Sequence, residues 1–334
     1  MAQLPTSPQI KAWAREIGFD LVGISEALPL DAANAQAWRD YLDQSRHASM
    51  HYLARTATQR LDPRQFVPQA QSIICTATNY YSPDPPSGPK PHDPDKSPPG
   101  AGPRGRIARY ARFGDYHDLI RQRLHLLKER IAQACHPKPR LRCCVDTAPL
   151  AEKYHAARAG IGWIGKNSLL LHPTFGSYLL LGEIVTDLPL EPDQPTPDHC
   201  RQCTRCLDAC PTAALTGPRC LDPRRCLAYW TTETEQLPPP DIARLLPPRL
   251  FGCDTCQDAC PFNQHPTPTS DPDRQPHPQW TYQTLADLVT LSDAALKERF
   301  AGSAIGRATP NHLRQLAQLA LKKAPNPHDS PENR

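Results

Sequence analysis

Closely spaced cysteines are the residues of this chain whose chemistry is easiest to predict. The segment HCRQCTRCLDACP holds four cysteines, separated by two, two and three residues and followed by proline: Cys200, Cys203, Cys206, Cys210 and Pro211. This spacing is typical of bacterial ferredoxins, in which three cysteines bind one [4Fe-4S] cluster and the fourth binds a second cluster. A second run should therefore exist, and GCDTCQDACPFN supplies Cys253, Cys256 and Cys260. The paired runs predict two [4Fe-4S] clusters.

Two such clusters need eight thiolates, so one ligand lies outside the two runs. We favour Cys226 over Cys220, because Cys226 precedes LAYWTTE, which is typical of an ordered element, whereas Cys220 lies in a GPRCLDP turn. The expected ligand sets are Cys200, Cys203, Cys206 and Cys260 for one cluster, and Cys210, Cys226, Cys253 and Cys256 for the other. Zinc is the alternative, but zinc sites usually combine pairs of ligands of the CxxC type.

Length and composition place the clusters in a larger protein. The chain has 334 residues, of which 39% are hydrophobic, and this is enough for two or three domains. It shows neither a membrane-spanning apolar stretch of roughly 18 residues nor a secretory signal. We therefore expect a cytoplasmic protein with no membrane partner, in which the 13 cysteines are reduced and available to metals.

The periodicity of the remaining segments predicts an α+β fold in three parts. Helices are expected over residues 7–18 with Ser7 as N-cap, 31–46, 118–134, 150–158 and 309–324. Strands are expected over residues 19–24, 71–80 and 141–145, and over 168–187 as a hairpin of two apolar strands. Residues 1–190 then form a mixed α/β domain with a Pro-rich loop at 82–104, residues 191–265 the cluster domain, and residues 266–334 a helical C-terminal segment.

Basic residues are concentrated in one part of the chain. Between Ala101 and Arg142, eleven basic residues face only three acids, and this excess fits a polyanionic partner. A solvated helix face is the alternative explanation. Four further cations near the C-terminus are candidate phosphate contacts: Arg307, Arg314, Lys322 and Lys323.

Five segments in a fixed order resemble one known family. They are RYARFGDYHDLIRQRL (109–124), VDTAPLAEKYHAARAGIGWIGKNSLLL (145–171), GSYLLLGEIVTD (176–187), the two cysteine runs and AGSAIGRATPNHLRQLAQLAL (301–321). Together they resemble the epoxyqueuosine reductases of the tRNA queuosine pathway, over about residues 11–324. The resemblance implies a monomeric oxidoreductase that converts epoxyqueuosine to queuosine at the wobble position of tRNA. It also implies a cobalamin-binding domain related to reductive dehalogenases, and Cys226 as the eighth cluster ligand.

The resemblance places Asp146 at the family's proposed proton donor. Removal of an epoxide oxygen needs two electrons and protons that carry the oxygen off as water, so a positioned acid is required. We expect a dry site to raise the pKa of Asp146 and keep it protonated. The alternative is that Asp146 caps the helix expected from about Leu150, because aspartate after a strand often has that role.

Further residues of the resembling segments are expected to border the cobalamin or the substrate: Arg60, Tyr110, Arg112, Asp146, Lys166, Asn167 and Ser168. The DxHxxG motif that carries a histidine to cobalt is absent, because Asp115-Tyr116-His117 is followed by Ile120 where the motif has glycine. An external low-potential electron donor is expected to feed the clusters. The competing functions are a reductive dehalogenase acting on a small molecule and a protein that only transfers electrons.

Overall fold

The computed structural model describes residues 4–84 and 103–322, and its larger sheet has four antiparallel strands. In spatial order they are β1 (Leu21–Glu26), β2 (Ser72–Asn79), β7 (Leu179–Thr186) and β4 (Leu141–Cys144). All eight residues of β2, SIICTATN, are buried, which fits its central position in the sheet. The strands expected near residues 19–24, 71–80 and 141–145 are confirmed.

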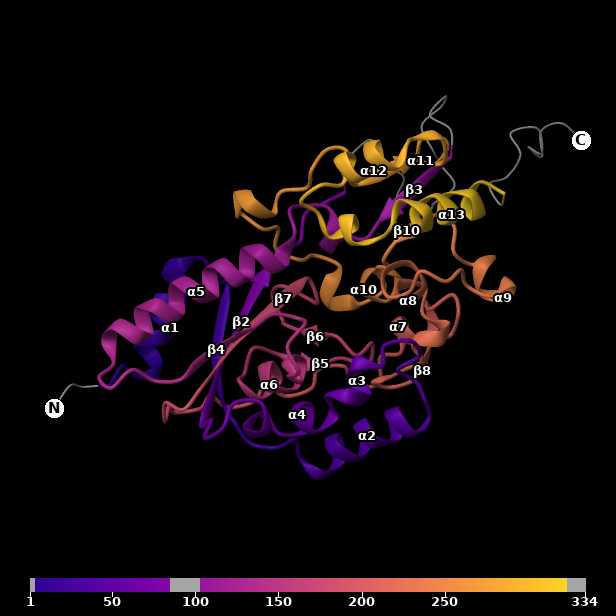
Figure 1. The fold of residues 1–334 in the computed structure, drawn as a ribbon. Coiled ribbons are helices and arrows are strands. Elements are labelled where there is room, and N and C mark those ends of the chain that lie inside the picture. The colour runs from indigo at the N-terminus through magenta and orange to yellow at the C-terminus, as the bar shows by residue number, and fades with distance from the viewer. Residues whose placement is uncertain (1–3, 85–102, 323–334) are drawn as a thin grey trace, which may run out of the picture.

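Helices cover both faces of this sheet (Figure 1). On one face, α1 (Ser7–Ile17) and α5 (Tyr116–Ala134) lie side by side and bury Ile10, Leu124 and Ile131 against β7 and its neighbours. On the other face, α6 (Glu152–Arg158) contacts β1, β2 and β7. Beyond it lie α2 (Ala32–Asp43), α3 (Tyr52–Arg55) and α4 (Ala57–Leu61). The segment that joins the end of β4 to the start of α6 therefore lies at one end of this sheet.

The start of α1 differs in one detail from the prediction. Thr6, and not Ser7, is the N-cap: its side chain accepts the Gln9 N–H, and the Gln9 side chain accepts the Thr6 N–H at 2.9 Å. This reciprocal pair satisfies two otherwise unpaired donors of the first turn. The Ser7 hydroxyl is buried and donates to the Glu191 carbonyl at 2.9 Å.

The expected hairpin over residues 168–187 is wrong. Its first strand, β6 (Leu170–Leu171), is only two residues long and pairs with β5 (Trp163–Ile164). Its second strand, β7, pairs along both edges with β2 and β4. The chain does turn between the two segments, where His172 and Gly176 form an isolated bridge, but β7 pairs within the sheet and not with β6.

A second, three-stranded sheet joins distant parts of the chain. Its order is β10 (Arg249–Phe251), β3 (Arg104–Ile107) and β11 (Tyr282–Thr284). Helices α11 (Leu285–Thr290), α12 (Asp293–Arg299) and α13 (Pro310–Leu321) pack with these strands around one core. All three predicted parts of the chain contribute to this sheet, so the division at residues 190 and 265 stays a prediction. Of the Pro-rich loop, residues 85–102 lie outside the described ranges.

The cysteine-rich region is built of short elements. They are α7 (Arg205–Asp208), β8 (Leu215–Gly217), β9 (Cys220–Leu221), α8 (Leu227–Thr232), α9 (Pro240–Ala243) and α10 (Thr255–Asp258). Helices α7 and α10, which belong to the two cysteine runs, contact each other. Among the helices of residues 4–84 and 103–322, none combines the length and the apolar character needed to cross a bilayer.

Candidate active site and cysteine sets

Asp146 occupies a loop between β4 and α6, where its backbone has a left-handed conformation with φ of 53°. Its backbone N–H donates to the Glu152 carboxyl at 2.6 Å, and its own carboxyl lies 3.0 Å from Nε2 of His117. The alternative role as a helix cap is wrong, because α6 begins at Glu152 with Ala151 as N-cap and has no side-chain cap. Slightly more than half of the Asp146 side chain, 54%, is accessible to water.

His117 connects Asp146 to two further charged residues. Its Nδ1 lies 2.7 Å from the Asp115 carboxyl, which also caps α5, and its Nε2 lies 3.1 Å from Nη1 of Arg307. Arg307 in turn pairs with Asp115 at 3.3 Å. Burial disfavours a charged imidazole, but the hydrogen bonds to Asp115 and Asp146 outweigh it and raise the pKa of His117. Nδ1 and Nε2 thus each face a carboxylate, while the positive charge of Arg307 beside Nε2 acts to lower the pKa of His117.

This arrangement changes the expectation for Asp146 itself. The hydrogen bond from His117, which outweighs the effect of burial, lowers the pKa of Asp146. The expected rise in the pKa of Asp146 is therefore not found, because the hydrogen bond from His117 and the charge of Arg307 favour the carboxylate. His117 is the neighbouring group that can hold a proton for Asp146.

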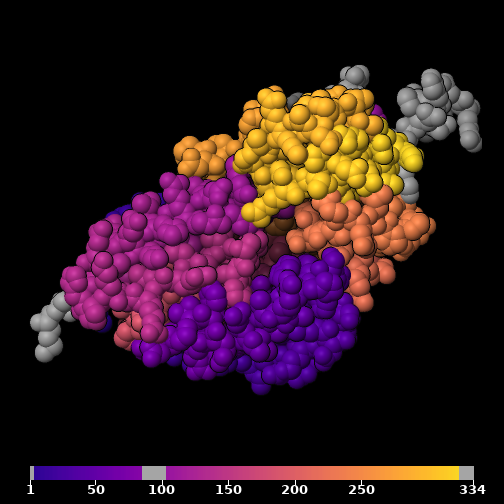
Figure 2. Space-filling view, viewed as in Figure 1, coloured from indigo at the N-terminus to yellow at the C-terminus, as the bar shows by residue number. Residues whose placement is uncertain are grey.

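The negative charge of Asp146 contributes to the pKa of four more side chains. Burial is the main cause that raises the pKa of Tyr52, Tyr110, Tyr116 and Glu233, and the negative charge of Asp146 adds to it in all four. They come from α3, from the turn before α5, from α5 and from the end of α8. We call these four residues together with Asp146, His117 and Arg307 the Asp146 group. In Figure 2, segments coloured indigo to purple, magenta, orange and yellow meet around a hollow near the centre of the view.

Two of the predicted cofactor residues lie in or beside the Asp146 group. Tyr110 is a member, and its ring packs against those of Tyr116 and Phe251. The buried Arg60 donates to the Leu150 carbonyl at 3.1 Å and lies 5.9 Å from the ring of Tyr52. Arg60 thus holds the far end of the Asp146 loop.

Arg112 is placed differently. Its guanidinium is 2% exposed, binds Asp84 at 2.5 Å and donates to the Ile107 carbonyl. It belongs to an ion-pair network in which Arg109 and Arg106 also bind acids, Asp84 and Asp258 among them. Arg123 likewise pairs with Asp271. The basic excess read from the sequence therefore overstates the charge available to a polyanion, because these four arginines are neutralised within the fold.

Two of the predicted residues after β5 carry buried side-chain atoms without a hydrogen-bond partner in the part of the chain that the structure describes. Asn167 and Ser168 are poorly accessible, and the Asn167 Nδ2 and Ser168 Oγ atoms have no hydrogen-bond partner among the described residues. Lys153 donates to the Ser168 carbonyl at 2.6 Å. Loss of contact with water lowers the pKa of Lys153, while the charges of Glu152, Asp146 and the Cys256 thiol act to raise it. Unpaired buried donors beside these charges fit a large polar ligand.

Lys166, the third predicted residue in this segment, has another partner. Its ammonium donates to the Arg201 carbonyl at 2.6 Å, and its own carbonyl accepts the Arg219 N–H at 2.9 Å. Lys166 thus joins the β5–β6 turn to the first cysteine run.

The thiols influence one another in two sets, and metal ligation by these sets stays a prediction. Burial, followed by the thiols of Cys200, Cys206 and Cys203, raises the pKa of Cys260 to about 11. Burial and then the thiols of Cys253, Cys226 and Cys210 raise the pKa of Cys256 in the same way. Each set therefore combines the two runs, as the ferredoxin crossing requires. Trp163 donates to Cys200 Sγ at 3.5 Å and packs with Cys260.

Cys226 and Cys220 have different surroundings. Cys226 lies with the second set, since burial and then Cys253 and Cys210 raise its pKa to about 11. Cys220 is bound by Arg46, whose Nη1 lies 2.5 Å from Sγ, and the hydrogen bonds of Thr216 and Arg46 lower its pKa. The structure thus brings Cys226, and not Cys220, to the second set, while the assignment of the metal ligand remains a prediction.

A pair of glutamates, the buried Glu183 and the partly exposed Glu152, lies beneath the Asp146 loop and was not anticipated. Glu183 on β7 is inaccessible to water, and neither of its oxygens meets an N–H or O–H donor among the described residues. Its neighbour is the carboxyl group of Glu152, and two carboxyl groups can share a hydrogen bond only when one is protonated. Burial, reinforced by their mutual repulsion, raises the pKa of Glu183 well above its ordinary range, and burial raises that of Glu152 to about 7.

This pair predicts a pH-dependent stability. A carboxyl group with a raised pKa in the folded state favours folding fully below its ordinary pKa, here near 4.5, and loses that contribution as the pH rises through about 7. We expect the melting temperature to fall between pH 5 and 8, and Glu183→Gln to reduce that fall by an amount equivalent to about 1 kcal/mol or more. Calorimetry across this range checks it, with exposed Glu129→Gln as control. Equal slopes for wild type and Glu183→Gln would contradict the shared proton.

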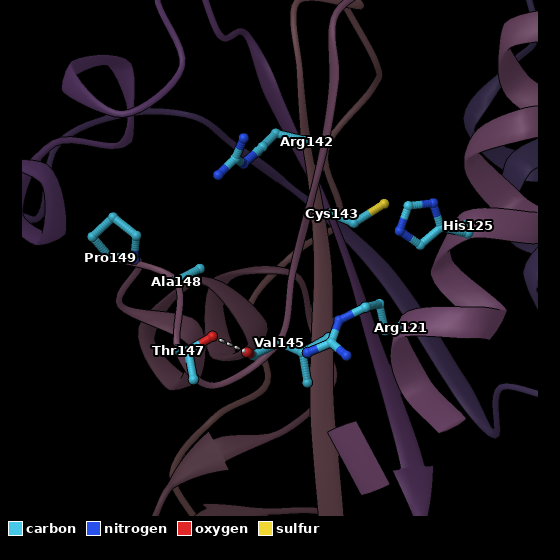
Figure 3. A pocket seen from close by; sticks show the side chains of 8 residues that line it. All are labelled: Arg121, His125, Arg142, Cys143, Val145, Thr147, Ala148 and Pro149. Carbon is cyan, nitrogen blue, oxygen red and sulfur yellow. Dashed lines mark hydrogen bonds between the residues drawn. The ribbon is translucent and has the colours of Figure 1, made fainter. Parts of the chain in front are cut away.

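A cavity of about 250 Å³ lies on the outer side of the same loop (Figure 3). It is lined by Arg121, His125, Arg142, Cys143, Val145, Thr147, Ala148 and Pro149. None of the predicted site residues lines it. It separates the loop from α5 and leaves the loop open on that side.

Comparison with known proteins gives consistent matches. The model described as "Epoxyqueuosine reductase QueG, DUF1730" matches residues 60–147, and a "4Fe-4S double cluster binding domain" matches residues 199–263. An epoxyqueuosine reductase of Pseudomonas aeruginosa is 40% identical over 321 residues, covering 95% of this chain and 85% of the relative. One of Gloeobacter violaceus is 39% identical over 322 residues, covering 95% and 96%.

Solved structures agree with these matches. A crystal structure of an epoxyqueuosine reductase with an epoxyqueuosine-modified tRNA-Tyr stem loop has a TM-score of 0.84 at 31% identity, covering 97% of this chain and 83% of that one. The Bacillus subtilis enzyme, described with its catalytic aspartate loop swung out of the active site, has a TM-score of 0.82 at 31% identity, with the same coverage. The predicted mixed α/β fold with a double-cluster domain is confirmed.

Proposed function

Because the chain belongs to the epoxyqueuosine reductase family, we propose that it removes the epoxide oxygen of epoxyqueuosine in tRNA and leaves queuosine at the wobble position. The observation that carries this proposal is the Asp146–His117 pair, in a fold that also gathers two groups of thiols. An acid and an electron supply are the two things that the reaction needs. The reaction is the last step of queuosine synthesis.

The substrate follows from the relatives. One solved relative binds a stem loop of tRNA that carries epoxyqueuosine, and we assign the same class of substrate to this chain. The base must leave the loop to reach Asp146, as bases do in other enzymes that modify them. More than half of the Asp146 side chain is accessible to water, so a base that leaves the loop can approach it.

The reaction balances with the groups available. The epoxide and two electrons and two protons give an alkene and one water molecule. The oxygen develops negative charge as its bond to carbon breaks, and a positioned acid lowers that barrier. Asp146 delivers one proton, which it takes from His117, and the solvent supplies the second; Asp115 and Arg307 hold the imidazole in place. Closure of the site by the base removes water from Asp146 and raises its affinity for the proton.

Cobalamin is the cofactor that we infer for the region around Asp146. The unpaired Asn167 Nδ2 and Ser168 Oγ atoms, with Lys153 and Arg60, fit the amides and charged groups of such a ligand. When bound, it supplies a reduced cobalt, which is a strong nucleophile toward an epoxide. Tyr110 and Tyr116 restrict water at the same place, since both side chains are largely enclosed. Arg112 has a structural position and contributes through the network that supports Tyr110.

The two thiol sets are assigned to [4Fe-4S] clusters, in accordance with the double-cluster domain. Clusters transfer electrons singly, so two transfers serve each epoxide. We further infer a monomeric, cytoplasmic enzyme that depends on an external low-potential donor.

Nucleoside analysis tests this function. The reconstituted, reduced protein is incubated with an anticodon stem loop that carries epoxyqueuosine. The stem loop is then digested to nucleosides, and their masses are measured by mass spectrometry. We expect the modified nucleoside to lose the mass of one oxygen atom. An unchanged nucleoside, with both clusters and cobalamin present, would exclude the proposed reaction.

The C-terminal arginines allow a sharper test of RNA binding. The side chain of Arg307 is 49% exposed beside Asp146, whereas Arg314 donates to the Leu291 carbonyl and pairs with Asp293. We expect affinity for the stem loop to fall with salt, and Arg307→Gln to lower that slope by about 0.7 to 0.9, the value of one phosphate contact. Arg314→Gln should leave the slope unchanged. Titrations at several salt concentrations measure both, and equal slopes for all three proteins would remove Arg307 from the RNA interface.

A further inference from the structure

The two thiol sets differ in their distance from the Asp146 group. The second set lies beside that group, because Tyr110 and Cys253 pack on the same apolar cluster, and a Cβ placed on Gly252, the residue before Cys253, would lie 3.2 Å from the Tyr110 ring. The first set lies beside Trp163 and Phe262 instead. Electrons that reach the Asp146 group through both clusters therefore enter at the first set and leave from the second.

Basic residues surround the first set at the surface. We call Lys166, Arg201, Arg205 and Arg219 the basic collar. Lys166 donates to the Arg201 carbonyl, and Arg219 donates to the Lys166 and Ile164 carbonyls at 2.9 Å each, so the collar is tied together through the backbone. Arg201 directly follows Cys200, Arg205 directly precedes Cys206, and both arginines are exposed.

The collar carries uncompensated charge. Arg219 pairs with Asp198, and the carboxyl of the neighbouring Asp208 accepts the Thr204 hydroxyl. Within the part of the chain that the structure describes, neither Arg201 nor Arg205 forms an ion pair, in contrast to Arg106, Arg109 and Arg123. Exposed, unpaired cations contribute little to folding, but they steer an oppositely charged partner and make its association depend on salt.

We propose that the basic collar is the docking surface for a small acidic protein that carries one electron at a time. The reduced carrier loses one electron to the oxidised cluster of the first set, and two such encounters supply the two electrons for each epoxide. Interfaces of this kind are small and brief, so a few charges around an exposed redox centre are sufficient. The proposal rests on the clusters alone and stands whether or not epoxyqueuosine is the substrate.

Charge reversal at the collar tests the proposal. The variant is Arg201→Glu with Arg205→Glu, in the holoenzyme with both clusters. The probe is a flavodoxin in its fully reduced form, and stopped-flow absorbance follows the reduction of the clusters at several salt concentrations. We expect the rate at low salt to fall tenfold or more and the difference from wild type to shrink as salt is added. Dithionite, a small chemical reductant, should reduce both proteins equally.

A matched control keeps the same change in net charge. Arg15→Glu with Lys138→Glu reverses two exposed cations outside the cysteine region and should leave the rate unchanged. If iron analysis shows that the glutamate variant loses clusters, Arg201→Gln with Arg205→Gln replaces it, with an expected fall of threefold or more. Reduction by flavodoxin at the wild-type rate would overturn the proposal. So would unchanged reduction with weaker binding of the stem loop, because the collar would then contact RNA.

Discussion

Replacement of Asp146 by asparagine should lower the turnover of epoxyqueuosine by about 10² to 10⁴, the usual contribution of general acid catalysis. Asparagine keeps the size of the side chain and can still accept a hydrogen bond from His117 Nε2. The backbone bond from residue 146 to Glu152 is also unaffected. The fold, both clusters and bound cobalamin should therefore remain, and only the ability to deliver a proton should be lost. Single-turnover assays of the stem loop measure the change.

The same substitution at Asp118 is the control for Asp146→Asn. Asp118 is an exposed acid in the first turn of α5, paired with Arg121, and Asp118→Asn should have wild-type turnover. Activity near wild type in Asp146→Asn would exclude the role of proton donor. Since α6 has no cap from Asp146, such a result could not be ascribed to asparagine serving as an equally good cap. Loss of cobalamin together with activity would instead assign Asp146 to cofactor binding, and the proton-donor role would be withdrawn.

The second large effect concerns the eighth cluster ligand. Cys226→Ser should lose about half of the eight irons of two [4Fe-4S] clusters, because it removes a thiolate from the second set. It should also abolish turnover, since the second set is the one beside the Asp146 group. Iron analysis and the visible spectrum of the anaerobically reconstituted protein measure the loss.

Cys220→Ser is the matched control in the same region. Its thiol is bound by Arg46, and we expect this variant to keep both clusters and full turnover. The reverse pattern, with iron lost from Cys220→Ser and kept in Cys226→Ser, would show that the second cluster is bound differently from the proposed set.

Much of the fold could be predicted from local patterns. The β-branched and apolar residues of β2 indicate a strand by themselves. Thr309, Pro310 and the leucines that follow at helical spacing indicate α13 in the same way. Failures arose where partners far along the chain decide the outcome. β7 pairs with β2 and β4 on either side, so β6 was left to the short β5, and no local signal reveals this choice.

The site shows the same division. The double-cluster domain could be predicted from the ferredoxin spacing of the cysteines, while the assignment of ligands to each cluster stays a prediction with which the pKa pattern of the thiols is compatible. The charge state of Asp146 could not, because it depends on His117, which lies 29 residues earlier in the sequence and is brought close only by packing of α5 on the sheet. Asp115-x-His117, an aspartate that caps a helix and binds the histidine two residues on, is the one local signal that was available.

The central claim is that the protein binds cobalamin at the Asp146 group for epoxide removal from a tRNA base. The most direct measurement reconstitutes the protein with iron and sulfide, divides it, adds cobalamin to one half, and follows both halves with the epoxyqueuosine stem loop and a chemical reductant. We predict that cobalamin stays with the protein through gel filtration and that only this half converts the nucleoside. Equal conversion in the half without cobalamin, or a cobalamin that elutes freely, would contradict the account.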